Sequence, residues 1–115
     1  RMTPVITLNT VIDNAGRGIF CRATAAADIF YNEILYNSGE GLYLAGANGS
    51  KVHFNILHGN GGAYDLHNGN GSSVNARSNY WSHAAGAEMQ AGVNPKNITR
   101  LFDIYDDNDQ GTVYY

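Results

Sequence analysis

The chain has 115 residues, a formal net charge of −3 and only 15% charged residues, a length that corresponds to one domain. This weakly acidic chain has no basic surface for nucleic acid or for an anionic membrane, and no apolar run is long enough to span a bilayer. We therefore expect neither nucleic acid nor a membrane as a partner, and the single cysteine, Cys21, excludes an internal disulfide.

Three copies of one short pattern occupy the first two thirds of the chain. Each copy reads apolar-x-x-Asn-x-apolar-x-x-Asn, and both asparagines recur every 23 residues. The first asparagines are Asn9, Asn32 and Asn55, and the second are Asn14, Asn37 and Asn60. Self-similarity at a fixed period of this length is typical of a solenoid.

Each repeat continues with a glycine-containing turn and a second apolar stretch, at residues 19–21, 42–44 and 64–66. Apolar residues alternate with other residues in these stretches, which indicates short, half-buried strands. The pattern predicts an all-β fold, a right-handed parallel β-helix of about four coils with a short C-terminal capping helix. The single domain, 1–115, would have coils at about residues 4–26, 27–49, 50–71 and 72–92, and a cap at 94–115.

In a parallel β-helix, equivalent positions of successive coils stack about 4.8 Å apart. Asparagine would occupy the corners, because it tolerates unusual backbone angles and bonds to nearby backbone. Stacked side-chain amides would also bond to one another, so we expect two asparagine ladders. The spacing further predicts five inward columns: Ile6/Ile29/Val52, Leu8/Tyr31/Phe54, Val11/Ile34/Leu57, Ile19/Leu42/Tyr64 and Cys21/Leu44/Leu66.

The fourth repeat is degenerate, and two alignments are open. In the first, Asn79 continues the first ladder and Trp81 stacks over Leu57, which places an extra residue in the loop 68–73. In the second, Arg77 takes the ladder position. A tryptophan fits the end of a column, so we favour the first alignment.

The last residues change in character. Asn94-Pro95 indicates the start of a helix, and an apolar stripe at helical spacing follows it. The stripe consists of Ile98, Leu101, Phe102 and Tyr105. We expect a helix of two to three turns that covers the last coil, followed by a final strand at 113–115.

The same region carries the most specific motifs of the chain. They are Asn79-Tyr80-Trp81, Asn94-Pro95-x-x-Ile98, and Ile104-Tyr105-Asp106-Asp107 before Gly111-x-Val113-Tyr114. With the repeats, they resemble right-handed parallel β-helix proteins of the pectin-lyase-like superfamily. The resemblance is to the periplasmic copper-site maturation type and its carbohydrate-binding and sugar-hydrolase relatives, although Ser82 stands where those proteins usually have glycine. It implies an extracellular or periplasmic location, whereas the fold itself hosts enzymes, adhesins and accessory proteins alike.

One outward strip carries the candidate binding residues. The strand after each glycine-containing turn would present Arg22, then Tyr43, then Asp65 and His67 on one outer face. These side chains suit an acidic sugar, because guanidinium groups bind carboxylates. We therefore expect a carbohydrate-associated module that binds or remodels an extracellular polysaccharide. Whether it is an enzyme stays open, since hydrolysis needs two carboxylates facing one groove and Asp65 has no second outward acid beside it.

We expect no metal and no cofactor, because His53 and His58 have no third ligand placed with them and copper prefers several soft or imidazole ligands. A second hypothesis is a structural or interaction protein. The chain enters its first coil directly after Pro4, which predicts open strand edges. Those edges would lead to a homo-oligomer or continue coils that lie upstream. A third hypothesis is an accessory protein of a periplasmic metalloenzyme.

Overall fold

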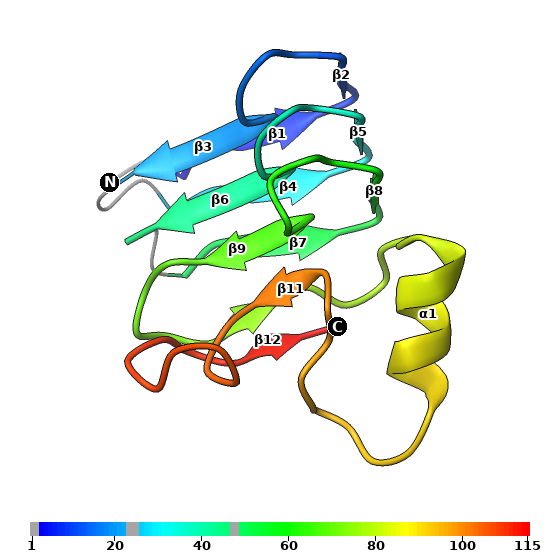
Figure 1. Cartoon of the computed structure of the whole chain (residues 1–115). Coiled ribbons are helices and arrows are strands. Elements are labelled where there is room, and N and C mark those ends of the chain that lie inside the picture. Colours follow the sequence, from blue (N-terminus) through cyan, green and yellow to red (C-terminus); the bar gives the residue numbers. More distant parts are fainter. Residues whose placement is uncertain (1–2, 23–25, 47–48) are drawn as a thin grey trace.

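The computed structural model of the chain describes residues 3–22, 26–46 and 49–115. It is a parallel β-helix, as the sequence predicts (Figure 1). The first coil contains β1 (Val5–Thr7), β2 (Thr10–Ile12) and β3 (Ile19–Arg22); the second contains β4 (Asp28–Phe30), β5 (Glu33–Leu35) and β6 (Leu42–Ala45); the third contains β7 (Lys51–His53), β8 (Ile56–His58) and β9 (Leu66–Asn68). The remaining elements are β10 (Val74–Asn75), α1 (His83–Gln90), β11 (Leu101–Phe102) and β12 (Val113–Tyr114).

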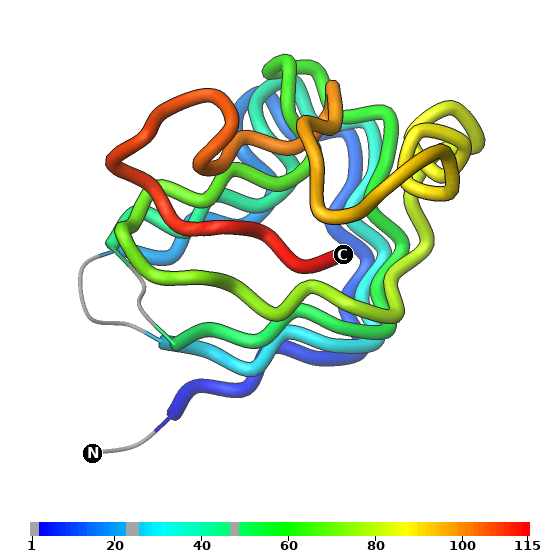
Figure 2. Tube along the Cα trace, turned by 90° about the horizontal axis from the view of Figure 1, so that it is seen from below, coloured from blue at the N-terminus to red at the C-terminus, as the bar shows by residue number. Residues whose placement is uncertain are grey.

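Three parallel sheets run along the solenoid. The β1 sheet has the order β1-β4-β7-β10-β12, the β2 sheet has the order β2-β5-β8, and the β3 sheet has the order β3-β6-β9-β11. Figure 2 shows the coils superposed in projection, with α1 at the side of the solenoid. Each coil therefore contributes equivalent positions to the same three faces.

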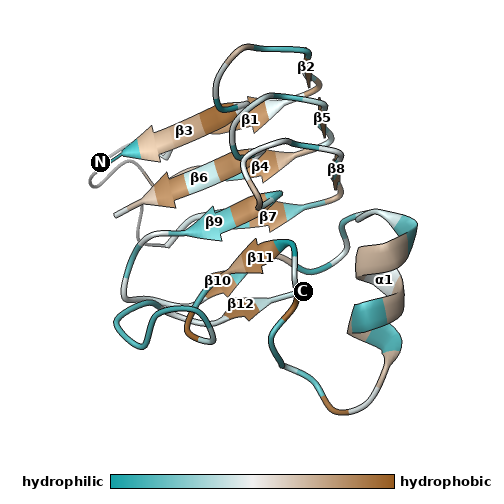
Figure 3. Cartoon of the chain, in the orientation of Figure 1, coloured by the Kyte–Doolittle hydropathy of each residue, from teal (hydrophilic) through white to brown (hydrophobic). Residues whose placement is uncertain are grey.

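Apolar side chains on these strands fill the interior. Figure 3 colours most of the strands partly brown, for hydrophobic residues, and much of the turns teal or white. Ile29 stacks on Val52 in the β1 sheet and Ile34 stacks on Leu57 in the β2 sheet, and all four are fully buried. Burial of this apolar surface is the main source of stability of the fold. The predicted columns at these positions are confirmed.

The predicted inward column Leu8/Tyr31/Phe54 is wrong. Leu8, Tyr31 and Phe54 lie at the surface, with exposed fractions of 81%, 56% and 53%. Their φ angles are 59°, 57° and 57°, so the backbone is left-handed just before each ladder asparagine. This conformation interrupts the alternation of an extended strand and turns the side chain outward.

Both predicted asparagine ladders are present. In the first, Nδ2 of Asn9 donates to Oδ1 of Asn32, and Nδ2 of Asn32 donates to Oδ1 of Asn55, each at 3.0 Å. The second ladder repeats this arrangement at 2.8 and 2.9 Å through Asn14, Asn37 and Asn60. Each acceptor oxygen also receives a backbone N–H from the preceding coil. The ladders therefore satisfy the polar groups of both corners.

The first alignment of the fourth coil is confirmed. Asn55 donates its backbone N–H and Nδ2 to Oδ1 of Asn79 at 2.9 and 3.0 Å. Tyr80 pairs with Ile56, which places Trp81 over Leu57. Trp81 is buried there and closes the column.

The third turn is longer than predicted. Leu66 pairs with Leu42, which in turn pairs with Ile19. The extra residue therefore lies in the turn 61–65 and not in the loop 68–73. The predicted inward column ending in Tyr64 is wrong, because Leu66 takes that position, and Asn68 rather than Leu66 follows Leu44.

The predicted helix near residues 94–105 is also wrong. The helix is α1, and it begins after Ser82, whose Oγ accepts a hydrogen bond from the backbone N–H of Ala85 at 3.1 Å. Ile98 and Leu101 are buried, but they belong to an irregular segment and to β11. Their apolar spacing reflects burial at the end of the solenoid. The predicted final strand is confirmed as β12, which extends the β1 sheet.

Candidate functional site

The outer face of the β3 sheet carries one aromatic or imidazole ring on each strand. We call these side chains, Phe20, Tyr43, His67 and Phe102, the ring strip. The ring centroids of Phe20 and Tyr43 lie 5.2 Å apart, and those of Tyr43 and His67 lie 4.0 Å apart. His67 and Phe102 follow at 4.2 Å. The ring strip therefore continues across all four strands of the sheet.

Charged side chains from the preceding turns lie beside the ring strip. Nε of Arg17 donates to Oε1 of Glu40 at 3.1 Å, and the Arg17 guanidinium lies 4.6 Å from the centre of the Phe20 ring. Oε2 of Glu40 lies 3.0 Å from Nδ1 of His67. Burial raises the pKa of Glu40, but its own backbone N–H, His67 and Arg17 together hold that pKa below its usual value. Glu40 therefore stays ionised between two donors.

Three of the four sequence-predicted binding residues lie on this face. Tyr43 and His67 stack with an angle of 11° between their ring planes. Arg22 lies at the end of β3, with its guanidinium 6.0 Å from the centre of the Phe20 ring. Asp65 is only 1% exposed, so the prediction that it faces outward is wrong. The extra residue in the turn 61–65 moves it from the strand to the corner.

Asp65 instead terminates the second asparagine ladder. Its Oδ1 accepts from the backbone N–H and from Nδ2 of Asn60 at 3.1 and 2.9 Å. Nε of Arg100 donates to its Oδ2 at 3.0 Å, and Nη2 of Arg100 donates to the Asn60 carbonyl. A buried carboxylate requires such partners. The role of Asp65 is therefore structural.

Arg17, Glu40 and Phe102 are site residues that the sequence alone did not reveal. Arg17 and Glu40 occupy the same position of successive glycine-containing turns, and their opposite charges one repeat apart were the available signal. Phe102 belongs to the stripe that predicts a helix, so its position on a strand could not be inferred from helical spacing. A binding face was predictable here, but not its full composition.

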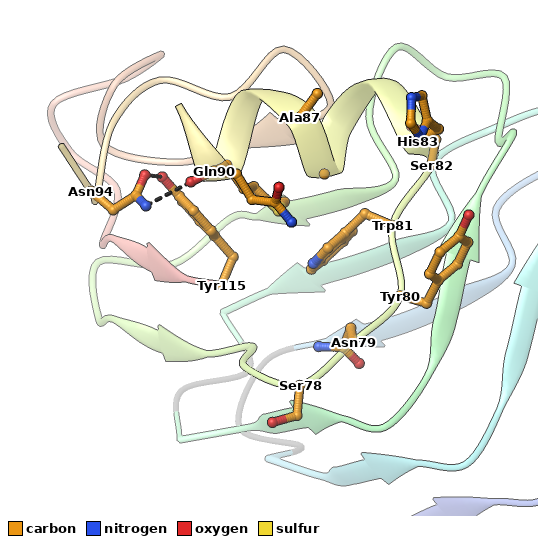
Figure 4. Close-up of a pocket in the computed structure, with 12 residues that line it drawn as sticks. Ser78, Asn79, Tyr80, Trp81, Ser82, His83, Ala87, Gln90, Asn94 and Tyr115 are labelled. Carbon is orange, nitrogen blue, oxygen red and sulfur yellow. Dashed lines mark hydrogen bonds between the residues drawn. The ribbon is translucent and has the colours of Figure 1, made fainter. Parts of the chain in front are cut away.

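A pocket of about 460 Å³ lies between α1 and the fourth coil (Figure 4). We call it the end pocket. Its lining residues include Tyr80, Trp81, His83, Gln90 and Tyr115. The Tyr115 hydroxyl donates to Oδ1 of Asn94 at its edge. No residue of the end pocket was predicted as a site residue, because α1 was not predicted.

The described residues contain no group of three or more histidine, cysteine, aspartate or glutamate side chains that could hold a metal ion. His67 bonds to Glu40, and His53 stacks on Phe30 with their ring centroids 5.7 Å apart. Burial raises the pKa of the Cys21 thiol, whereas a metal binds the thiolate. Within residues 3–22, 26–46 and 49–115, no helix is long and apolar enough to cross a membrane.

A family model described as periplasmic copper-binding protein (NosD) matches residues 3–94. This family is periplasmic and associated with copper-site maturation, which agrees with the predicted extracellular or periplasmic location. Among the described residues, no three histidine, cysteine, aspartate or glutamate side chains lie together as ligands for a copper ion. No curated protein and no solved structure matches the chain.

Proposed function

Because the chain belongs to the family of periplasmic copper-binding proteins (NosD), we propose that it acts outside the cytoplasm as a β-helix module that binds a polysaccharide. The polymer would lie along the outer face of the β3 sheet. The observation that carries this proposal is the ring strip, which places one ring on every strand beside charged hydrogen-bonding groups. The resemblance to carbohydrate-active β-helix proteins supports the same substrate class.

The chemistry of the ring strip matches the surface of a sugar. Sugars present apolar C–H groups and hydroxyl groups side by side, and the strip presents rings next to a polar rim. The Tyr43 hydroxyl and the Arg22 guanidinium make no hydrogen bond to another described residue, so both remain available to a ligand. Guanidinium groups bind carboxylates in a bidentate manner. The site therefore favours a polymer that contains uronic acids.

The geometry favours binding over hydrolysis. Glycoside hydrolysis by the usual route needs two carboxyl groups that flank the scissile bond. Among the described residues, Glu40 is the carboxylate beside the ring strip, and it is already paired with Arg17 and His67. Asp65 is buried at the ladder end. We therefore assign the face to recognition of the polymer rather than to its cleavage.

The test is affinity electrophoresis of the protein through gels that contain either a uronic or a neutral polysaccharide. We expect retardation by the uronic polymer and a loss of affinity on the order of tenfold for Arg22→Ala, because a charge-assisted hydrogen bond is removed. Lys51→Ala is the matched control, since it removes one exposed cation from another sheet. Release of oligosaccharides is followed in the same samples. Absence of retardation in every polysaccharide would overturn the proposal, and release would identify an enzyme.

A second candidate function is an interaction protein that uses its first coil. β1, β2 and β3 each lie at the edge of their sheet among the described residues. Val5 is 58% exposed, and the inward residues Ile6, Val11 and Ile19 are only partly buried. Such edges pair readily with another strand. This surface would accept a further coil, from a second copy or from residues upstream of the first coil.

A further inference from the structure

We infer that the end pocket is a second ligand site, which binds one or two rings of a neutral sugar. It lies between α1 and the fourth coil, whereas the ring strip lies on the β3 sheet. Its volume of about 460 Å³ falls within the usual range for small-molecule sites. The inference therefore goes beyond the polymer-binding face and stands on residues of its own.

Trp81 provides the first observation. Its side chain is only 5% exposed, yet its indole Nε1 donates no hydrogen bond to another described residue. Among the described residues, Oγ1 of Thr7 is the only side-chain polar atom that is both fully enclosed and without a hydrogen-bond partner. Since Nε1 of Trp81 also has no partner, it cannot be fully enclosed, and it keeps some contact with open space. Figure 4 shows the indole beneath α1 with its nitrogen directed into the pocket. A buried tryptophan normally pairs this donor, and here the pairing is left to a ligand.

Gly86 provides a second, independent observation. It lies inside α1 and lines the end pocket, and a Cβ atom added to it would meet no atom within 4 Å. Glycine is among the poorest residues for a helix interior, and no close packing requires it here. The space beside Gly86 is therefore open, and a larger side chain at this position would occupy it.

The lining determines the class of ligand. It contains hydroxyl, amide, indole and imidazole groups, and no aspartate, glutamate, lysine or arginine. His83, Gly86 and Gln90 share one face of α1, and neither the His83 ring nor the Gln90 amide bonds to another described residue. Tyr80 adds an exposed aromatic ring at the opposite wall. Uncharged donors and acceptors around aromatic rings suit a neutral polyhydroxylated ring better than an ion.

Intrinsic fluorescence tests this inference directly, because Trp81 is the only tryptophan of the chain. The purified protein is titrated with glucose, galactose, mannose, N-acetylglucosamine and cellobiose, with galacturonate and inorganic phosphate as anionic comparisons. We expect a saturable change in tryptophan emission with at least one neutral sugar and none with the anions. A stronger response to cellobiose than to glucose would indicate that the end pocket binds the end of a sugar chain rather than a free monosaccharide.

Two matched pairs of variants locate the ligand. Gly86→Leu fills the pocket and should weaken sugar binding by at least about tenfold, without lowering the melting temperature, because leucine favours the helix. Ala84→Leu on the exposed, non-lining side of α1 is its control and should bind as the parent does. Gln90→Ala should weaken binding, whereas Gln110→Ala should not.

The outcomes separate this site from the ring strip. Arg22→Ala should leave the fluorescence titration unchanged, and Gly86→Leu should leave retardation by the uronic polymer unchanged. A flat titration with every neutral sugar would overturn the inference, as would full binding by Gly86→Leu. A response to galacturonate or phosphate alone would overturn the assignment to a neutral ligand. None of these results depends on whether the polymer binds the β3 sheet.

Discussion

The residues that precede the ladder asparagines combine bulk, exposure and a left-handed backbone. Leu8, Tyr31 and Phe54 all have φ near 57° to 59°, a conformation that costs an L-residue about 1–2 kcal/mol. At the second corner, Gly59 adopts φ 71° and meets this requirement without strain. The corner geometry is therefore imposed by the ladders, and these large residues tolerate it at a cost in stability.

Replacement of Leu8 by asparagine should stabilise the protein. Because Leu8 is 81% exposed, its replacement removes few packing contacts. Asparagine also adopts the left-handed backbone region more readily than leucine. We expect the free energy of unfolding, measured in urea, to rise by about 0.5–1 kcal/mol. Val5→Asn is the control, because Val5 is exposed but lies on the extended strand β1, where asparagine is unfavourable. Destabilisation by Leu8→Asn would show that the packing of the leucine side chain outweighs the strain of the left-handed backbone.

Among the structural elements, the asparagine ladder contributes unevenly along its length. Nδ2 of Asn32 donates to Ile6 O at 2.9 Å, to Phe30 O at 3.1 Å and to Oδ1 of Asn55 at 3.0 Å. Asn32 is buried, whereas Asn9 at the start of the ladder is exposed. Loss of a buried donor leaves carbonyl groups without partners, but solvent can replace an exposed one.

We therefore expect Asn32→Ala to lower the free energy of unfolding by about 2–4 kcal/mol and Asn9→Ala to lower it by about 1 kcal/mol or less. Urea denaturation followed by circular dichroism measures both. Equal losses for the two variants would mean that the side-chain bonds of the ladder matter less than the preference of asparagine for the corner.

The repeating elements were predictable from the sequence, whereas the irregular ones were not. The 23-residue spacing predicted both ladders, and Asn79 marked the fourth coil correctly. The sequence of the turn 61–65 does not reveal its extra residue. Tyr64 and Leu66 fit the alternation of inward and outward positions as well as Leu66 and Asn68 do. That displacement also placed Asp65 on the wrong face. α1 buries only Ala85 and Met89, and two apolar contacts produce too weak a helical period to be recognised.

At the scale of the whole molecule, the two ends of the solenoid differ. The strands β1, β2 and β3 present open edges among the described residues, while the segment that follows α1 crosses the other end and α1 itself lies at the side (Figures 1 and 2). Two copies that meet through their first coils would form a closed, two-fold assembly instead of a fibre. We propose that these exposed edges pair with those of a second copy.

Light scattering coupled to size-exclusion chromatography should therefore give a mass that increases with concentration toward twice the 12.4 kDa of the chain. The double variant Val5→Lys and Ile12→Lys should remain monomeric, because lysines at the rim of the first coil repel those of a second copy. The double variant Phe54→Lys and Tyr80→Lys, away from that coil, is the matched control. The mass of one chain at all concentrations would argue against pairing through the first coil.

The pairing of Asp65 with Arg100 fixes the corner at which the second asparagine ladder ends. An asparagine both accepts and donates, so each one can pass the ladder to the next coil, and Oδ1 of Asn9 and of Asn14 accepts from no described residue. An ionised aspartate only accepts hydrogen bonds, so Asp65 has no side-chain donor with which to continue the ladder. Arg100 neutralises its charge. The second ladder therefore ends at this corner, while the first ladder and the sheets continue into the fourth coil. An asparagine in place of Asp65 could donate as well as accept, so it could pass the second ladder to an asparagine of a further coil.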